Sequence, residues 1–187
     1  MTDPRPILLW FRRDLRLSDH PALHEAARSG RPVIPVFLCD EGVETLGAAP
    51  RMRIGMGVAE LARSLEALGS RLVLRRGPAL EALQALVAET GAGAVWWTRL
   101  HDPLSRRRDD GVAKGLGVEA RAFPGHLLHE PETVRTGAGG PSRSTAHFSG
   151  HCAPATRASR CRRRGGSPGQ SAGPNRTVWR TGGSTRR

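Results

Sequence analysis

The fold of this chain is decided by Pro6-Ile-Leu-Leu-Trp-Phe-Arg-Arg-Asp-Leu-Arg-Leu-Ser-Asp-His-Pro-Ala-Leu23. Residues 7–11 are all apolar, as in a strand that is buried on both faces of a parallel sheet. A dense charged turn follows, and Pro21 then begins a helical pattern that stops at Gly30. Ligands of open α/β sheets bind at the carboxyl ends of the strands, so this turn is where a site is expected.

The same alternation of apolar run and helical pattern continues to residue 123. Further strands are expected at 32–38, 71–75, 94–98 and 118–123, and further helices at 51–68, 78–90 and 104–116. Pro35 is a mild objection to the second strand, since proline removes a ladder donor, and residues 41–50 are expected to form a loop. The short connections predict an α/β, Rossmann-like fold, with a five-stranded parallel sheet of order 3-2-1-4-5 flanked by helices.

Basic residues are concentrated at the end of the chain. The net charge is +12, yet residues 1–140 hold 19 Lys and Arg against 17 Asp and Glu, whereas residues 141–187 hold 10 Arg and no acidic residue. The latter segment also contains no Leu or Ile, so it cannot bury a core. We therefore predict an α/β domain over 1–135 and a disordered Arg/Gly/Ser/Pro-rich tail over 136–187. A selected tail of this kind would bind nucleic acid through its phosphates.

Several classes of protein are disfavoured by simple patterns. The chain has no apolar run of eighteen residues, which argues against a membrane span. Its three cysteines lack metal-ligand spacing, and a reduced, cytoplasmic protein is the plain inference. No Gly-x-Gly-x-x-Gly fingerprint or Walker loop follows the first strand. The histidines show no Ser or Cys partner pattern, so a hydrolytic triad is not supported.

Residues 10–19, Trp-Phe-Arg-Arg-Asp-Leu-Arg-Leu-Ser-Asp, resemble the opening of the DNA photolyase/cryptochrome family. Further similarity lies in residues 69–77, 96–98, 102–109, 127–131 and 136–137, so the resemblance covers about residues 1–140. The chain departs from the family at three positions: His20 and Thr98 stand where the family tends to have Asn, and Leu104 where it has an aromatic residue. The last two departures lie beside the fourth strand, where an antenna pigment would bind.

The resemblance implies a two-domain flavoprotein. In the intact family, the α/β domain houses an antenna chromophore, which is a folate, a deazaflavin or a flavin. A following helical domain binds FAD and damaged DNA, and light-driven electron transfer from the FAD splits a pyrimidine dimer. The FAD site belongs to the second domain, so this chain is expected to be a truncated, inactive member that retains the antenna domain. No specific protein partner is expected.

Candidate antenna-binding residues follow the carboxyl ends of the expected strands. They are Phe37, Leu38, Cys39, Asp40, Arg51, Asp102 and Arg106. Phe37 could contact a planar ring, Asp40 could accept hydrogen bonds from ring N–H groups, and Arg51 could meet an anionic tail. Plainer roles are a core position for Phe37, helix caps for the two aspartates and a solvated helix end for Arg51. No catalytic residue or metal ligand is predicted.

The charged turn after the first strand is expected to be held by ion pairs. The two expected pairs are Arg13–Asp14 and Arg16–Asp19. Their role would be structural, because they would hold the loop that follows the first strand.

The tail has a second interpretation. The family usually continues after Thr-Gly with a segment like Gly-Pro-Phe-Lys-Val-Tyr-Gly-Pro-Phe. Codons for Phe-Lys-Val-Tyr-Gly-Pro-Phe-Leu-Arg-Ala-Leu that lose one T from the first codon can encode Ser-Arg-Ser-Thr-Ala-His-Phe-Ser-Gly-His-Cys, which is the sequence of residues 142–152. This predicts a frameshift near codon 142. Two other functions stay open, a stand-alone nucleotide- or flavin-binding α/β domain and a nucleic-acid-binding module that uses the tail.

Overall fold

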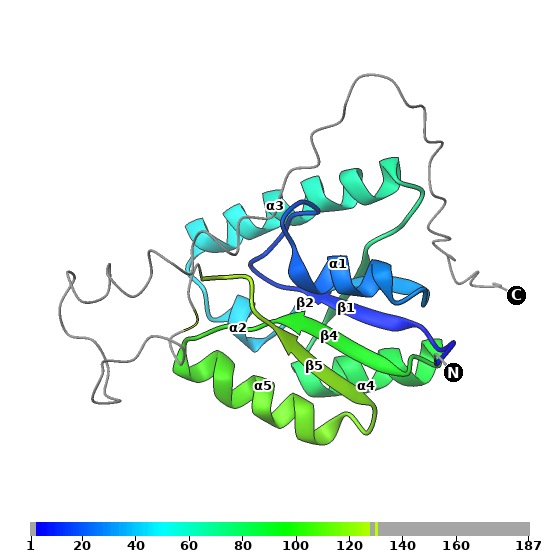
Figure 1. Cartoon of the computed structure of the whole chain (residues 1–187). Coiled ribbons are helices and arrows are strands. Elements are labelled where there is room, and N and C mark those ends of the chain that lie inside the picture. The colour runs from blue at the N-terminus through cyan, green and yellow to red at the C-terminus, as the bar shows by residue number, and fades with distance from the viewer. Residues whose placement is uncertain (1–2, 128–129, 131–187) are drawn as a thin grey trace, which may run out of the picture. The chain divides into compact units, whose positions relative to one another are not determined.

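The structure is a computed structural model that describes residues 3–127 and 130. Strands and helices alternate along the described chain (Figure 1). The strands are β1 (Ile7–Phe11), β2 (Val33–Cys39), β3 (Val73–Arg76), β4 (Ala94–Thr98) and β5 (Glu119–Phe123). The helices are α1 (Pro21–Arg28), α2 (Glu41–Glu44), α3 (Ala48–Ala67), α4 (Ala79–Thr90) and α5 (Pro103–Gly115).

The five strands form one parallel sheet of order β3-β2-β1-β4-β5. The first strand is paired on both sides, with Ile7 opposite Val33 of β2 and opposite Ala94 of β4. Every residue of β1 is buried, which is why that strand is apolar throughout. The predicted fold class and strand order are confirmed.

Helices cover both faces of the sheet, and alternate residues of β1 enter two different cores (Figure 1). Ile7, Leu9 and Phe11 pack with Ala22 of α1 and Leu61 of α3. The core on the other face contains Leu8 and Trp10 of β1, Leu83 and Leu86 of α4, Val112 of α5, and Leu116 just after α5. A three-layer α/β architecture follows from this alternation.

Pro35 is accommodated inside β2 although this strand lies between two neighbours. It stands opposite Leu9 in the β1–β2 ladder. The β2–β3 ladder begins one residue later, where Val36 pairs with Val73. Pro35 therefore precedes the β3 pairing, so its missing N–H is compatible with the strand.

The prediction of a loop over residues 41–50 is wrong in part. Residues 41–44 form α2, and α3 begins at Ala48 rather than at Arg51. Asp40 starts α2 by accepting a hydrogen bond from the Val43 backbone N–H at 3.0 Å. The glycines of this segment disfavour helix by propensity, and the cap outweighs that preference. The predicted disordered tail over 136–187 lies outside the described residues.

Candidate functional site

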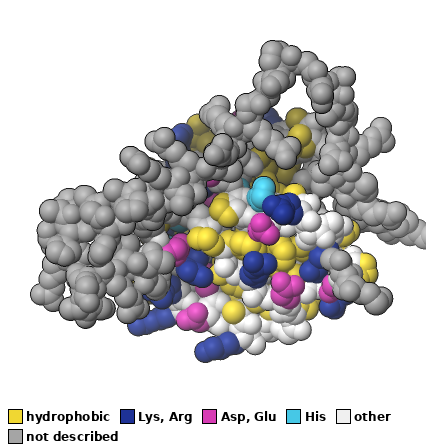
Figure 2. Space-filling view, viewed as in Figure 1, with side chains coloured by type: hydrophobic (Ala, Val, Ile, Leu, Met, Phe, Trp, Pro, Cys, Tyr) yellow, Lys and Arg dark blue, Asp and Glu magenta, His cyan; other side chains and the backbone are white. Residues whose placement is uncertain are grey.

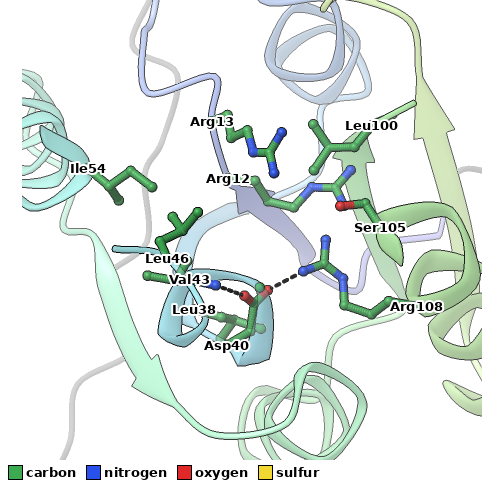
Figure 3. A pocket seen from close by; sticks show the side chains of 11 residues that line it. Arg12, Arg13, Leu38, Asp40, Val43, Leu46, Ile54, Leu100, Ser105 and Arg108 are labelled. Atoms are coloured by element: carbon green, nitrogen blue, oxygen red, sulfur yellow. Dashed lines mark hydrogen bonds and ion pairs between the residues drawn. The ribbon is translucent and has the colours of Figure 1, made fainter. Parts of the chain in front are cut away.

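The carboxyl ends of β1, β2 and β4 bring charged side chains together at one edge of the sheet. Arg12 and Arg13 follow β1, Asp40 follows β2, and Arg108 reaches the same place from α5 (Figure 3). The switch in strand order lies between β1 and β4, as in other doubly wound sheets. We call the hollow that these residues line the strand-edge pocket. Its other lining residues are Leu38, Gly42, Val43, Leu46, Ile54, Leu100 and Ser105.

Arg12 forms a buried ion pair at this edge of the sheet. Its Nη1 donates to both carboxylate oxygens of Asp109, at 2.7 and 2.9 Å, and its Nη2 donates to the backbone carbonyl of Thr98. The guanidinium carbon lies 4.7 Å from the ring centre of Trp10, a cation–π distance. Burial lowers the pKa of Arg12, and the charge of Asp109 opposes that shift. These contacts tie β1 to β4 and α5.

Asp40 and Arg108 form a second ion pair across the pocket. Arg108 Nη1 lies 2.8 Å from Asp40 Oδ2, and the two side chains are 12% and 4% exposed. Burial raises the pKa of Asp40, while the charge of Arg108 acts in the opposite direction. A Cβ atom at Gly42 would lie 2.8 Å from Arg108 Nη1, so the absence of a side chain there lets the guanidinium approach α2.

The charged turn after β1 is held by different pairs from those predicted. Asp14 is paired with His20, whose Nε2 lies 2.8 Å from Asp14 Oδ2. Arg13 lies 3.6 Å from Asp102, and Arg16 donates to the backbone carbonyl of Asp19 instead of its carboxylate. The predicted Arg13–Asp14 and Arg16–Asp19 ion pairs are therefore corrected. The turn contacts the start of α1 through His20 and the start of α5 through Asp102. The Asp102 contact joins residues far apart in the sequence, so local patterns could not predict it.

His20 takes a structural role in the turn. Its Nδ1 accepts a hydrogen bond from the Leu23 backbone N–H at 3.1 Å and so caps α1. Its Nε2 then carries the proton that faces Asp14. Burial by itself would raise the pKa of Asp14, but hydrogen bonds from His20, from Thr98 and from the Arg12 backbone lower it below its usual value.

The strand-edge pocket is small. Its volume is about 30 Å³, which is room for about two water molecules. Cofactor sites enclose roughly 300–1,000 Å³. A folate, deazaflavin or flavin ring therefore does not fit among these side chains as they lie. We derive no role for such a group from this pocket.

A wider and more open hollow lies beside α3. Its volume is about 600 Å³, and Arg13, Leu15, Ile54, Met56 and Gly57 are among the residues that line it. A Cβ atom at Gly57 would lie 2.8 Å from Leu15 Cδ1, so the turn after β1 packs closely on the helix there. Met56 is 54% exposed, and the charged residues Arg53, Glu60 and Arg63 also line this hollow, so its surface is mixed.

The structure brings two of the seven predicted ligand residues to the strand-edge pocket. These two are Leu38 and Asp40. Phe37 is buried in the core on the α1–α3 face, and Cys39 is half-buried with a free thiol. The remaining three are Asp102, which caps α5 through the Ser105 N–H, and Arg51 and Arg106, which are exposed. Their roles toward a ligand stay predictions.

Sequence reasoning missed the two arginines that dominate the pocket, Arg12 and Arg108. The sequence did contain a pattern that indicated the buried side of α5, because Ser105, Asp109 and Val112 recur at helical spacing. In the structure all three are buried. An acidic residue on the buried face of a helix needs a cationic partner, and Arg12 in the charged turn was available. The position of Arg108 beside Asp109 then follows from the helix.

Within the described residues, no group of three or more His, Cys, Asp or Glu side chains is placed to hold a metal ion. The helices of this part of the chain are too short or too polar to cross a bilayer. On the face shown in Figure 2, basic and acidic side chains are interspersed over the described surface. That face therefore lacks the single-sign patch that marks a nucleic-acid footprint.

The fold and the strand-edge site define an open, doubly wound α/β domain, and sequence comparison shows its family. A profile of the DNA photolyase family matches residues 7–162. The chain belongs to the DNA photolyase family. The match extends past residue 142, where the frame change was predicted, and so lends that prediction no support.

Relatives of two kinds are similar to this chain. It is 43% identical over 146 residues to a deoxyribodipyrimidine photo-lyase of Agrobacterium fabrum, covering 76% of this chain and 30% of that protein. It is 37% identical over 152 residues to cryptochrome-1 of Arabidopsis thaliana, covering 78% and 22%. A crystal structure of a class III photolyase from Agrobacterium tumefaciens superposes with a TM-score of 0.76 at 40% identity, covering 81% of this chain and 32% of that one.

This chain therefore spans less than a third of the length of these relatives. The shared part is the α/β domain, which photolyases and cryptochromes have in common.

Proposed function

We propose that this chain is the N-terminal α/β domain of a light-dependent photolyase or cryptochrome and that, by itself, it neither retains FAD nor repairs pyrimidine dimers. The observation that carries the proposal is the pairing of a family match over residues 7–162 with coverage of 30% of the Agrobacterium fabrum photo-lyase. In the flavin-driven reaction the flavin performs the electron transfer, and the protein supplies position and electrostatics.

The strand-edge pocket supports a narrower point, which is that no flavin ring lies among these side chains. A volume of about 30 Å³ at the strand edge leaves no room for a flavin. Residues Arg12, Asp40, Arg108 and Asp109 at this edge pair with one another, so their charges are already compensated. These pairs and caps hold the turn after β1 and the starts of α2 and α5.

The test is the ultraviolet and visible spectrum of the purified 187-residue chain, with extraction of any bound small molecule. The proposal predicts protein absorption without a flavin contribution. Bound adenine nucleotide would favour the alternative of a stand-alone nucleotide-binding domain. FAD at one equivalent per chain would overturn the proposal.

We also propose that residues from about 142 onward are read in a shifted frame. The support is the eleven-residue agreement between residues 142–152 and a one-base deletion in codons for a family-like segment. The composition of residues 141–187, with 10 Arg and no Leu or Ile, is what an out-of-frame GC-rich gene would encode. Resequencing the locus decides the matter: an open, family-like helical domain in the next frame is expected, and a next frame that is closed would refute it.

A further inference from the structure

The strand-edge pocket is filled by a side chain of the protein itself. Arg108 extends from α5 across the hollow toward Asp40 at the end of β2, as Figure 3 shows. We propose that Arg108 determines the specificity of this pocket by occupying the space that a planar ring would need. The proposal goes beyond the function proposed above, because it concerns what the pocket admits and not what the whole protein does.

Three contacts hold the guanidinium in place, and a glycine leaves room for it. Asp40 lies 2.8 Å from Nη1, and Asp109 lies 3.4 Å from Nη2. The guanidinium carbon is 5.1 Å from the ring centre of Trp10. Gly42 leaves the space into which Nη1 fits. With a side chain only 12% exposed, Arg108 is a part of the pocket wall, not a mobile surface arginine.

The walls behind this arginine have the chemistry of a ring-binding site. Leu38, Val43 and Leu46 supply apolar surface on the β2–α2 side, and Leu100 supplies it on the β4 side. Trp10 lies buried behind these walls, and both Arg12 and Arg108 lie over its ring, at 4.7 and 5.1 Å from the ring centre. Small-molecule sites are lined in this way, by apolar and aromatic groups with a few polar ones. Removing the Arg108 guanidinium would uncover the apolar side chains, while Arg12 would remain over Trp10.

Asp40 holds Arg108 in the pocket, so a variant that removes Arg108 must also deal with the Asp40 carboxylate. Its Oδ1 caps α2 through the Val43 N–H, and its Oδ2 takes the Arg108 pair. Asparagine at this position keeps the cap, since Asn is a good N-cap residue, and carries no charge that would be left buried without a partner. Asp40→Asn combined with Arg108→Ala therefore opens the pocket and leaves no buried carboxylate without a partner.

The experiment titrates riboflavin with the full 187-residue chain and follows its fluorescence anisotropy. The wild-type chain is expected to bind it weakly, and the Asp40→Asn/Arg108→Ala variant at least about tenfold more tightly, because a closed pocket lowers apparent affinity by the fraction that is open. The matched control is Arg107→Ala, which removes an exposed neighbouring arginine of α5 and leaves the Asp40–Arg108 pair intact. Far-UV circular dichroism shows whether each variant is folded.

A second measurement distinguishes two causes of tighter riboflavin binding: removal of the guanidinium from the pocket, and a general loosening of the fold by the substitutions. In the single Arg108→Ala variant, which keeps the Asp40 carboxylate, millimolar ethylguanidinium should reinsert a guanidinium into the pocket and weaken riboflavin binding, with no effect on the control. If the double variant does not fold, Arg108→Ala alone is titrated in the same way. Equal riboflavin affinity of the folded variant and the control would overturn the proposal, as would tight binding by the wild-type chain. Neither result would bear on FAD retention or repair.

Discussion

The buried pair of Arg12 and Asp109 offers the sharpest test of how the strand edge is held. The two side chains are 5% and 10% exposed, and Arg12 also donates to the Thr98 carbonyl. Arg12→Met keeps most of the stem but leaves the Asp109 carboxylate buried with only its longer contact to Arg108, at 3.4 Å. Removing one partner of a buried pair costs about 3–5 kcal/mol, and we expect about 3 kcal/mol because that contact persists.

The matched control is Arg63→Met. Arg63 pairs with Glu60 one turn away on α3, but these side chains are 72% and 63% exposed. Such surface pairs contribute about 0–1 kcal/mol. Urea unfolding followed by circular dichroism gives both free energies of unfolding, and the thermal midpoint should fall by roughly 10 °C for Arg12→Met. Equal losses in the two variants would refute the reasoning that burial makes the strand-edge pair strong.

Three further predictions follow from other parts of the domain. His20→Ala removes the α1 cap and the proton that faces Asp14, so it should cost about 2 kcal/mol in urea unfolding, whereas His24→Ala, at an exposed site, should cost little. The lowered pKa of Asp14 means that its ionised form stabilises the fold above about pH 4, the pKa of an unperturbed aspartate, and that this stability is lost as the pH falls further; Asp14→Asn should flatten the acid limb, and an unchanged limb would contradict this. Met52→Lys with Met56→Lys replaces side chains that are 69% and 54% exposed, so it should raise the concentration at which the protein aggregates in light scattering.

Local sequence patterns were sufficient to predict the strands and helices that form the layers of this fold. The five apolar residues of β1 predicted a central strand, and Asp102 before Pro103 predicted the start of α5, where it accepts from the Ser105 N–H at 2.9 Å. Both signals depend on neighbours in the chain, namely burial period and cap chemistry. Strand order followed from the alternation of strands and helices, because crossover connections limit the available topologies.

The contacts that shape the candidate site could not be read in the same way. Arg12 and Asp109 are 97 residues apart, and Asp40 and Arg108 are 68 apart. Several arginines follow the same strands, and which of them points inward depends on helix rotation. Arg106 was predicted to contact a ligand. Arg108, two residues further along α5, lies on the side of the helix that lines the strand-edge pocket, whereas Arg106 is exposed. Phe37 pointed to the opposite core for the corresponding reason, since adjacent strand residues face opposite ways.

The central claim is that this chain is the α/β domain of a photolyase-family protein and cannot perform the family's reaction unaided. The most direct measurement is an illuminated repair assay with the purified 187-residue chain on DNA that contains pyrimidine dimers, run with and without added FAD, and with a dark control. The account predicts the same number of dimers before and after illumination under both conditions. Light-dependent loss of dimers with this chain alone would contradict it.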